Sequence, residues 1–412
     1  VNGRAIVLRG DARQLPLPDA SVDLIVTSPP YWALRDYRDG DESLAGQIGN
    51  EASPGEYLES LWECTREWMR VLKPEGSMFV VLGDKYSDRA DGGPASAKSW
   101  REDRAGCLPP GRSSTAMAPR KSRLMLPERY RIGCLDLGLL VRSVIIWSKP
   151  SAMPESVTDR VRTAHEDIVH LVKQPRYYAA VDEIRNPASD YERKPGARRS
   201  TPPGQRRRAM ADTVNPLGAL PGSVWEIASQ PLVVPEHLGT DHFAAFPFEI
   251  PRRIIRGWSP SGICSECGEG RRPVAGVSGQ EEYRDLPLLD SHKRRSAERA
   301  WRGGIETSGL SRPGWRKNGR PERAIAGYAC ACPDPTAPTR PAVVLDPFGG
   351  SGTTALVAST LGRRGVSVDR SAGYCRLAQW RTTDPGERAR ALGLPKPQPV
   401  HPGQDSLFEG IA

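Results

Sequence analysis

The chain has 412 residues, 38% of them hydrophobic and 26% charged, and carries a formal net charge of +9 at pH 7. This length allows one main domain with inserted subdomains, and the basic surplus favours a polyanionic partner. A run of about 18 apolar residues and a charged-then-apolar leader are both missing from the sequence, which excludes a membrane-spanning helix, so we expect a soluble, cytoplasmic protein with no membrane partner.

Strand and helix patterns alternate in the amino-terminal part of the chain. Apolar runs predict strands over residues 5–8, 22–26 and 78–82. Helical apolar spacing predicts a helix over residues 57–72, which ends at a turn formed by residues 73–76. This alternation predicts a doubly wound parallel sheet.

The second strand runs directly into Thr-Ser-Pro-Pro-Tyr-Trp at residues 27–32. Two prolines end a strand in a stiff, extended turn and leave the carbonyls of Ser28 and Pro29 without ladder partners. Ligands bind at the carboxyl ends of strands in open α/β sheets, so this turn is a candidate substrate site. The alternative is a surface turn with a hydrophobic plug, and Trp32 fits either role.

The middle of the chain alternates between polar and apolar stretches. Residues 87–123 are rich in Gly, Pro, Ser and charge, which predicts a mobile loop, and a helix over residues 124–139 follows. Strands are predicted over residues 140–147 and 166–173. A polar stretch over residues 186–217 then holds a basic cluster, which is either a nucleic-acid contact or a solvated charge run.

Two closely spaced cysteine pairs stand out, Cys264-x-x-Cys267 and Cys330-x-Cys332, with a polar stretch between them. Such pairs in a chain without a secretory signal favour a structural tetrathiolate zinc site over a disulfide framework. The second pair has one intervening residue instead of two, so a lost metal site or an unrelated pairing remains the alternative.

The last ordered section begins with a strand over residues 343–346 that ends in Asp-Pro-Phe-Gly-Gly-Ser-Gly-Thr-Thr, residues 346–354. A helix over residues 355–361 and a strand ending at Asp369 follow. A glycine-rich turn before a helix forms a nucleotide-type pocket, and an acid at the next strand end is placed to bind ribose hydroxyls. The spacing matches neither the dinucleotide nor the phosphate-loop pattern, which favours an adenosine cofactor without phosphates, such as S-adenosylmethionine.

Together these two motifs resemble those of the amino-methylating DNA methyltransferases of the TSPPY type. The catalytic motif precedes the cofactor motif, which is the order of the family's β group. Four shorter segments resemble the family as well: residues 10–11, 145–149, 242–247 and 364–369, although many members carry Glu where this chain has Asp369. The resemblance implies a circularly permuted, Rossmann-like methyltransferase sheet with inserted target-recognition and zinc-ribbon-like segments.

The resemblance also implies a reaction, namely methyl transfer from S-adenosylmethionine to the exocyclic amine of a flipped base in double-stranded DNA. Ser28 is typical of cytosine-N(4) enzymes, whereas adenine-N(6) enzymes usually carry Asp or Asn there, so cytosine is favoured and adenine stays the alternative. Methylation of a cytosine ring carbon is excluded because none of the eight cysteines follows a proline. A DNA-binding module that has lost catalysis is a remote alternative.

The site prediction has three parts. In the catalytic part, the Ser28 hydroxyl and the Pro29 carbonyl hold the amine, Tyr31 stacks on the base, and Trp147 forms a second face; this part comprises Ser28, Pro29, Pro30, Tyr31 and Trp147. The cofactor part comprises Asp11, Thr27, His242, Ala245, Phe246, Pro247, Asp346, Phe348, Gly350, Ser351, Thr353, Thr354 and Asp369. The metal part comprises Cys264, Cys267, Cys330 and Cys332.

The predicted catalytic domain consists of residues 1–185, 236–258 and 341–385. Residues 186–235 are assigned to target recognition, residues 259–340 to the cysteine subdomain and residues 386–412 to a flexible tail. Expected partners are double-stranded DNA and zinc. A second copy of the chain and a separately encoded restriction endonuclease are further partners that the resemblance leaves open.

Overall fold

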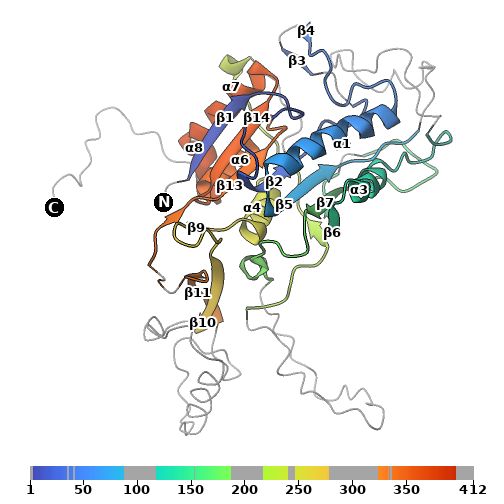
Figure 1. The fold of residues 1–412 in the computed structure, drawn as a ribbon. Helices are drawn as coiled ribbons and strands as arrows, with labels where there is room; N and C mark the ends of the chain where they lie inside the picture. The colour runs from blue at the N-terminus through green and yellow to red at the C-terminus, as the bar shows by residue number, and fades with distance from the viewer. Residues whose placement is uncertain are drawn as a thin grey trace, which may run out of the picture.

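The computed structural model describes residues 3–34, 37–39, 42–87, 117–152, 154–186, 217–239, 246–277, 323–332, 334 and 336–395. An eight-stranded sheet forms the centre of the molecule (Figure 1). In spatial order, its strands are β1 (Arg4–Arg9), β14 (Arg364–Asp369), β13 (Val343–Asp346), β2 (Val22–Thr27), β5 (Leu72–Leu82), β7 (His165–Val172), β6 (Leu140–Ser148) and β8 (Val224–Glu226).

The strand order reverses between β13 and β2. From β13 the chain passes through α6 (Thr353–Thr360) to β14 on one side, and from β2 it passes through α1 (Pro54–Val71) to β5 on the other. Strands β1, β14, β13, β2 and β5 are parallel, which confirms the doubly wound sheet and its permuted order. The sheet is mixed rather than wholly parallel, because β7 pairs antiparallel with both β5 and β6.

Helices cover both faces of the sheet. On one face, α1 and α3 (Leu126–Asp136) bury large side chains, Trp68, Tyr57 and Tyr130 among them. On the other face, α4 (Glu249–Trp258) and α6 pack Ile254 and Leu356 against the strands. Each fully buried side chain of this size contributes about 1.5–3 kcal/mol to folding, so the two cores hold the strand ends in place.

The turn predicted at residues 73–76 is wrong, because α1 leads directly into β5. Val22 pairs with Leu72 whereas Leu24 pairs with Ser77, so residues 73–76 form an irregularity inside the strand. An ion pair between Lys73 and Asp23 holds this irregularity. Gly76 is required there, since a Cβ atom would lie 2.9 Å from the Asp23 carbonyl oxygen.

The flexible tail predicted from residue 386 is also wrong over its first residues. Helix α8 (Pro385–Leu392) follows α7 (Ala372–Thr383) directly and packs against α6 and α7. Asp384 caps α8 by accepting a hydrogen bond from the Glu387 amide at 2.8 Å, and Ala391 lies in the core. The predicted tail beyond residue 395 lies outside the described residues, as do residues 88–116 of the predicted mobile loop.

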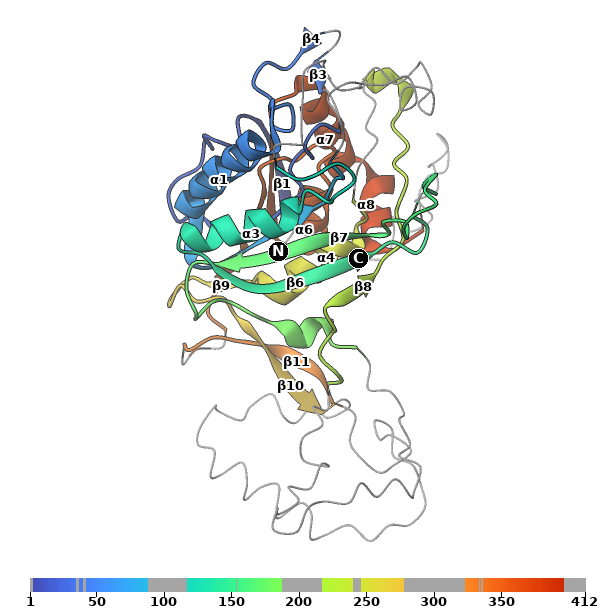
Figure 2. The same cartoon turned by 90° about the vertical axis from the view of Figure 1, so that its right-hand side faces the viewer.

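Smaller elements complete the fold. The ribbon of β10 (Arg272–Val277) and β11 (Arg323–Ala329) extends away from the main sheet (Figure 2). Two short strand pairs are present, namely β9 (Ile263–Cys264) with β12 (Thr339–Arg340) and β3 (Arg38–Asp39) with β4 (Glu42–Ser43). The described residues also include the short 3-10 helices η1 (Val181–Ile184) and η3 (Glu236–Leu238). Within the described ranges, no helix combines the length and the apolar character needed to cross a bilayer.

Candidate active site and cysteine cluster

One edge of the sheet carries the two main predicted motifs. The carboxyl ends of β1, β14, β13, β2 and β5 lie at this edge because these strands are parallel and adjacent. The amino-terminal end of the antiparallel strand β7 reaches the same edge. Ser28, Asp346 and Asp369, which are far apart in the sequence, therefore come together around the point where the strand order reverses, the expected ligand position in such a sheet.

The double-proline turn after β2 is held from two sides. The Tyr57 hydroxyl of α1 donates a hydrogen bond to the Pro30 carbonyl at 2.9 Å. On the other side, the Ala33 amide donates to the Gly49 carbonyl at 2.7 Å. Gly49 has φ +91°, and a Cβ atom there would lie 2.9 Å from the Tyr31 carbonyl oxygen. The turn is thus fixed before any ligand binds.

Trp32 is a core residue. It is 4% exposed, packs in the same core as α1, and donates its indole N–H to the Glu51 carbonyl at 3.1 Å. Of the two roles that the sequence allows for this side chain, the structure therefore supports the hydrophobic plug.

Tyr31 lies across Gly83, the residue that follows β5. A Cβ atom on Gly83 would lie 2.7 Å from the ring atom Cε2, so only glycine leaves room for the ring. The Tyr31 hydroxyl donates to Glu166 Oε2 at 2.7 Å. Burial, together with the Glu166 carboxylate, raises the pKa of Tyr31 well above its ordinary value, so the hydroxyl stays protonated.

Trp147 does not offer the second stacking face that the sequence predicts. It is 5% exposed, and its indole N–H donates to the Ile227 carbonyl at 2.8 Å. The Lys149 ammonium lies 4.3 Å from the ring centre, and the rest of the ring packs in the core on the α4 side of the sheet. The prediction is wrong, because this aromatic residue near the site packs in the hydrophobic core.

Asp346 joins the two motifs. Its Oδ1 accepts hydrogen bonds from the Thr27 hydroxyl at 2.7 Å and the Phe348 amide at 3.1 Å, and its Oδ2 accepts from the Thr354 hydroxyl at 2.9 Å. Burial raises the pKa of Asp346 to about 6, although these donors favour the ionised form. Four residues predicted as cofactor contacts thus bind one another and couple the end of β2 to the start of α6.

The glycine-rich turn approaches β14 closely. A Cβ atom on Gly349 would lie 1.9 Å from the Ser367 hydroxyl, and Gly352 has φ +74°. Asp369 Oδ2 accepts a hydrogen bond from the Gly350 amide at 2.9 Å, and Oδ1 accepts from the Ser371 amide at 2.9 Å. These two hydrogen bonds fix the Asp369 carboxylate beside the glycine-rich turn.

Sequence reasoning missed Arg381, which holds the same turn from α7. Its Nη1 donates to the Ser351 hydroxyl at 2.8 Å and the Thr353 hydroxyl at 2.9 Å, and its Nε donates to Glu387 Oε2 at 2.9 Å. Its side chain is 3% exposed. Ser351 and Thr353 are therefore tied to the protein itself. An arginine on the buried side of a helix, on the same side as Leu377 and Ala378, is the signal for such a role.

The remaining predicted cofactor residues lie around this frame. Asp11 accepts from the Arg13 amide at 2.9 Å, and Phe348 packs edge-on against Trp68 with ring centres 5.9 Å apart. Phe246 packs against the core on the α4 side, and the Pro247 carbonyl accepts from the Ile250 amide at the start of α4. The predicted contacts His242 and Ala245 lie outside the described residues.

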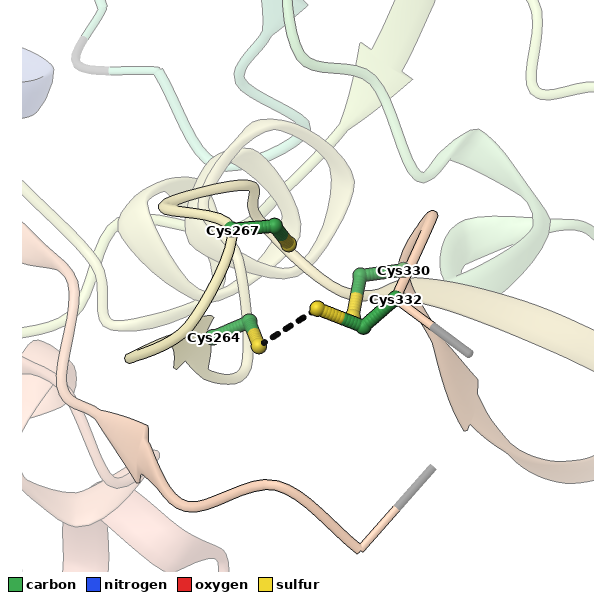
Figure 3. A group of neighbouring side chains, drawn as sticks. All are labelled: Cys264, Cys267, Cys330 and Cys332. Atoms are coloured by element: carbon green, nitrogen blue, oxygen red, sulfur yellow. Dashed lines mark hydrogen bonds between the residues drawn. The ribbon is translucent and has the colours of Figure 1, made fainter. Parts of the chain in front are cut away.

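The four cysteines form a cluster at the base of the β10–β11 ribbon (Figure 3). Their sulfur atoms all lie within 4.8 Å of one another, and the Sγ atoms of Cys264 and Cys332 are 3.6 Å apart. Ligands about 2.3 Å from a tetrahedral zinc ion would have sulfurs about 3.8 Å apart, so the cluster has the size of such a site. The amides of Cys267 and Glu266 lower the pKa of the Cys264 thiol to about 6, which favours the thiolate that metals bind.

Comparisons with known proteins agree with this geometry. A family model described as DNA methylase matches residues 22–263 and 339–380, so the match is interrupted where the cysteine segment is inserted. The chain is similar to the type II methyltransferase M.SmaI of Serratia marcescens, with 31% identity over 310 residues that cover 70% of this chain and 91% of the relative. It is also similar to the type II methyltransferase M.Cfr9I of Citrobacter freundii, with 31% identity over 309 residues that cover 70% and 87% of the two chains.

Among solved structures, the chain is similar to the PvuII DNA methyltransferase (cytosine-N4-specific), with 15% identity and a TM-score of 0.49 over 95% of this chain and 92% of that one. The family match and the relatives decide the assignment, and the double-proline turn and the glycine-rich turn at one sheet edge give it a physical basis. The chain belongs to the N6/N4 DNA methylase family and is an S-adenosylmethionine-dependent DNA methyltransferase.

Proposed function

We propose that this DNA methyltransferase acts on the N(4) amine of cytosine in double-stranded DNA. The observation that carries the proposal is Ser28 at the end of β2, beside the stacking candidate Tyr31. In the family that this chain resembles, a hydroxyl at this position is typical of the cytosine-N(4) enzymes, whereas a carboxylate or an amide is typical of the adenine-N(6) enzymes. Methylation of adenine N(6) is the alternative.

The turn has the acceptors that the reaction needs. The lone pair of an exocyclic amine is delocalised into the base, so acceptors that hold its hydrogens help to direct the lone pair at the methyl donor. Tyr57 already occupies the Pro30 carbonyl, whereas no side chain in the described part of the protein donates to the Pro29 carbonyl. Ser28 Oγ and the Pro29 carbonyl are therefore the proposed acceptors.

The neighbouring groups fit the other requirements. A base inside a duplex is out of reach, so it must be flipped out, and Tyr31 is the proposed stacking partner. Asp369 and the turn around Gly350 fit an adenosine cofactor, because a carboxylate, which accepts hydrogen bonds from hydroxyl groups, is fixed beside a tightly packed glycine turn at the ends of adjacent strands. When bound there, S-adenosylmethionine supplies an electrophilic methyl group.

Expression in a host without DNA methylation tests the choice of base. Single-molecule sequencing of the host DNA is expected to reveal N(4)-methylcytosine at one recurring sequence. The Ser28→Ala variant, expressed to the same level, is expected to leave the DNA unmodified while still binding S-adenosylmethionine. Recovery of N(6)-methyladenine from the wild-type strain would overturn the proposal.

We also propose that Cys264, Cys267, Cys330 and Cys332 bind a structural zinc ion. The mutual distances of the four sulfurs support this. Elemental analysis of the purified protein is expected to find about one zinc per chain, since four thiolates fill one tetrahedral site. Cys264→Ser is expected to lose the metal, whereas Cys134→Ala, at a buried cysteine far from the cluster in sequence, is expected to keep it. Equal zinc contents in both variants would refute the site.

Target recognition is proposed for the predicted range 186–235, with one correction: β8 lies inside this range but pairs with β6, so it belongs to the catalytic sheet. The arginines of this region between residues 187 and 216 lie outside the described residues. Replacing Arg206, Arg207 and Arg208 with alanine is expected to weaken DNA binding and to flatten its salt dependence, because each lost phosphate contact reduces counterion release. Unchanged salt dependence would contradict a DNA contact. A homodimer and a separately encoded restriction endonuclease remain predictions.

A further inference from the structure

Tyr31 is connected to two charged residues that the predicted site does not include. Its hydroxyl donates to Glu166 Oε2 at 2.7 Å, and Glu166 Oε1 forms an ion pair with the Lys149 ammonium. The three residues come from separate segments, namely the turn after β2, the start of β7 and the end of β6. The antiparallel register brings Glu166 opposite Trp147, two residues before Lys149.

The ion pair gives the Tyr31 hydrogen bond a fixed direction. The side chains of Glu166 and Lys149 are 15% and 21% exposed, so the pair is largely shielded from water. An ionised carboxylate only accepts hydrogen bonds, and the Lys149 ammonium binds the other oxygen of the Glu166 carboxylate. Tyr31 must therefore donate to Glu166, and hydrogen bonds of this charge-assisted kind are about twice as strong as neutral ones.

The Tyr31 side chain is held at both the ring and the hydroxyl. The ring lies against Gly83, where a Cβ atom would come within 2.7 Å of ring atom Cε2. At the far end of the side chain, the hydroxyl is bound by Glu166. These two contacts fix the orientation of the ring.

We propose that Lys149 and Glu166 are positioning residues for methyl transfer, which hold the Tyr31 ring in one orientation over Gly83 so that it can stack on the flipped base. This inference rests on the proposed stacking role of Tyr31. It adds two residues to the reaction, neither of which touches the base itself.

Single-turnover methyl transfer to cognate DNA, with separate measurement of the KM for S-adenosylmethionine, tests the inference. Tyr31→Phe and Glu166→Gln are each expected to lower the rate about 10- to 100-fold, the equivalent of one hydrogen bond to a charged group, with little change in KM. The double variant is expected to be no slower than either single variant, because both remove the same interaction. Lys149→Arg is expected to retain most of the activity that Lys149→Met loses.

The adjacent pair on β7 offers a matched control. Asp167 forms an ion pair with Arg131 at 3.0 Å, and the alternation of the strand directs it away from the Glu166 side. Asp167→Asn is expected to leave the transfer rate unchanged. Wild-type rates in both Tyr31→Phe and Glu166→Gln would overturn the inference. If Ser28→Ala also kept the wild-type rate, the proposed function would fail with it, whereas an inactive Ser28→Ala would restrict the failure to the positioning role.

Discussion

Replacing Arg381 with methionine is expected to destabilise the protein and to weaken cofactor binding together. The guanidinium is almost fully buried, donates to Ser351 and Thr353 in the glycine-rich turn, and pairs with Glu387 of α8. Breaking a buried ion pair by removing one partner costs about 3–5 kcal/mol, because the other charge stays behind. Arg390 lies 3.4 Å from Glu387 and offsets part of that cost. We therefore expect a loss of about 3 kcal/mol in the free energy of unfolding.

Urea unfolding followed by tryptophan fluorescence measures the loss, and the KM for S-adenosylmethionine measures the effect on the turn. The KM for the cofactor is expected to rise while the KM for DNA stays close to that of the wild type, since the hydroxyls that Arg381 binds belong to the glycine-rich turn. Arg390→Met is the control, because its side chain is 39% exposed and an exposed pair contributes about 0–1 kcal/mol. A destabilisation no larger than that of the control, with an unchanged cofactor KM, would refute the reasoning.

Two further predictions concern the same sheet edge. Burial raises the pKa of Asp346 to about 6 in the folded protein, above its ordinary value of 3.8. The contribution of this carboxyl group to the free energy of unfolding is therefore fully present below a pH of 3.8 and is lost as the pH rises through about 6. Relative to Asp346→Asn, the wild type is expected to gain stability as the pH falls from 7 to 4. Urea titrations at each pH measure the free energy of unfolding of both proteins, and a difference between them that does not change with pH would contradict the prediction. Gly83→Ala is expected to displace the Tyr31 ring and lower the transfer rate, whereas Gly327→Ala, where a Cβ atom meets nothing within 4 Å, is expected to have no effect in the same assay.

The parts of the site that sequence predicts well are local. The prolines at residues 29 and 30 and the glycines at residues 349–352 each dictate the backbone of a few neighbouring residues, so their motifs place a turn at a strand end without knowledge of the sheet. The strands with uniform apolar runs, β2 and β13, follow for the same reason.

The residues that sequence missed act over long distances. Glu166 reaches Tyr31 only because β7 runs antiparallel to β5, and no local pattern states that direction. Arg381 reaches Ser351 through the packing of α7. Trp147 was assigned to the site because it stands near the end of its strand, but its ring packs in the core and its indole N–H binds the Ile227 carbonyl, a contact between segments 80 residues apart.

The short pairing of β9 with β12 has a consequence for how the cysteine segment relates to the rest of the enzyme. Ile263 pairs with Arg340, and Cys264 pairs with Thr339, so the chain leaves the catalytic domain and returns to it at neighbouring points. The DNA methylase match stops at residue 263 and resumes at residue 339, at this same pair. The strand pair therefore holds the two ends of the segment side by side, so we expect a replacement segment of a different length to join the catalytic domain at these residues without moving β13.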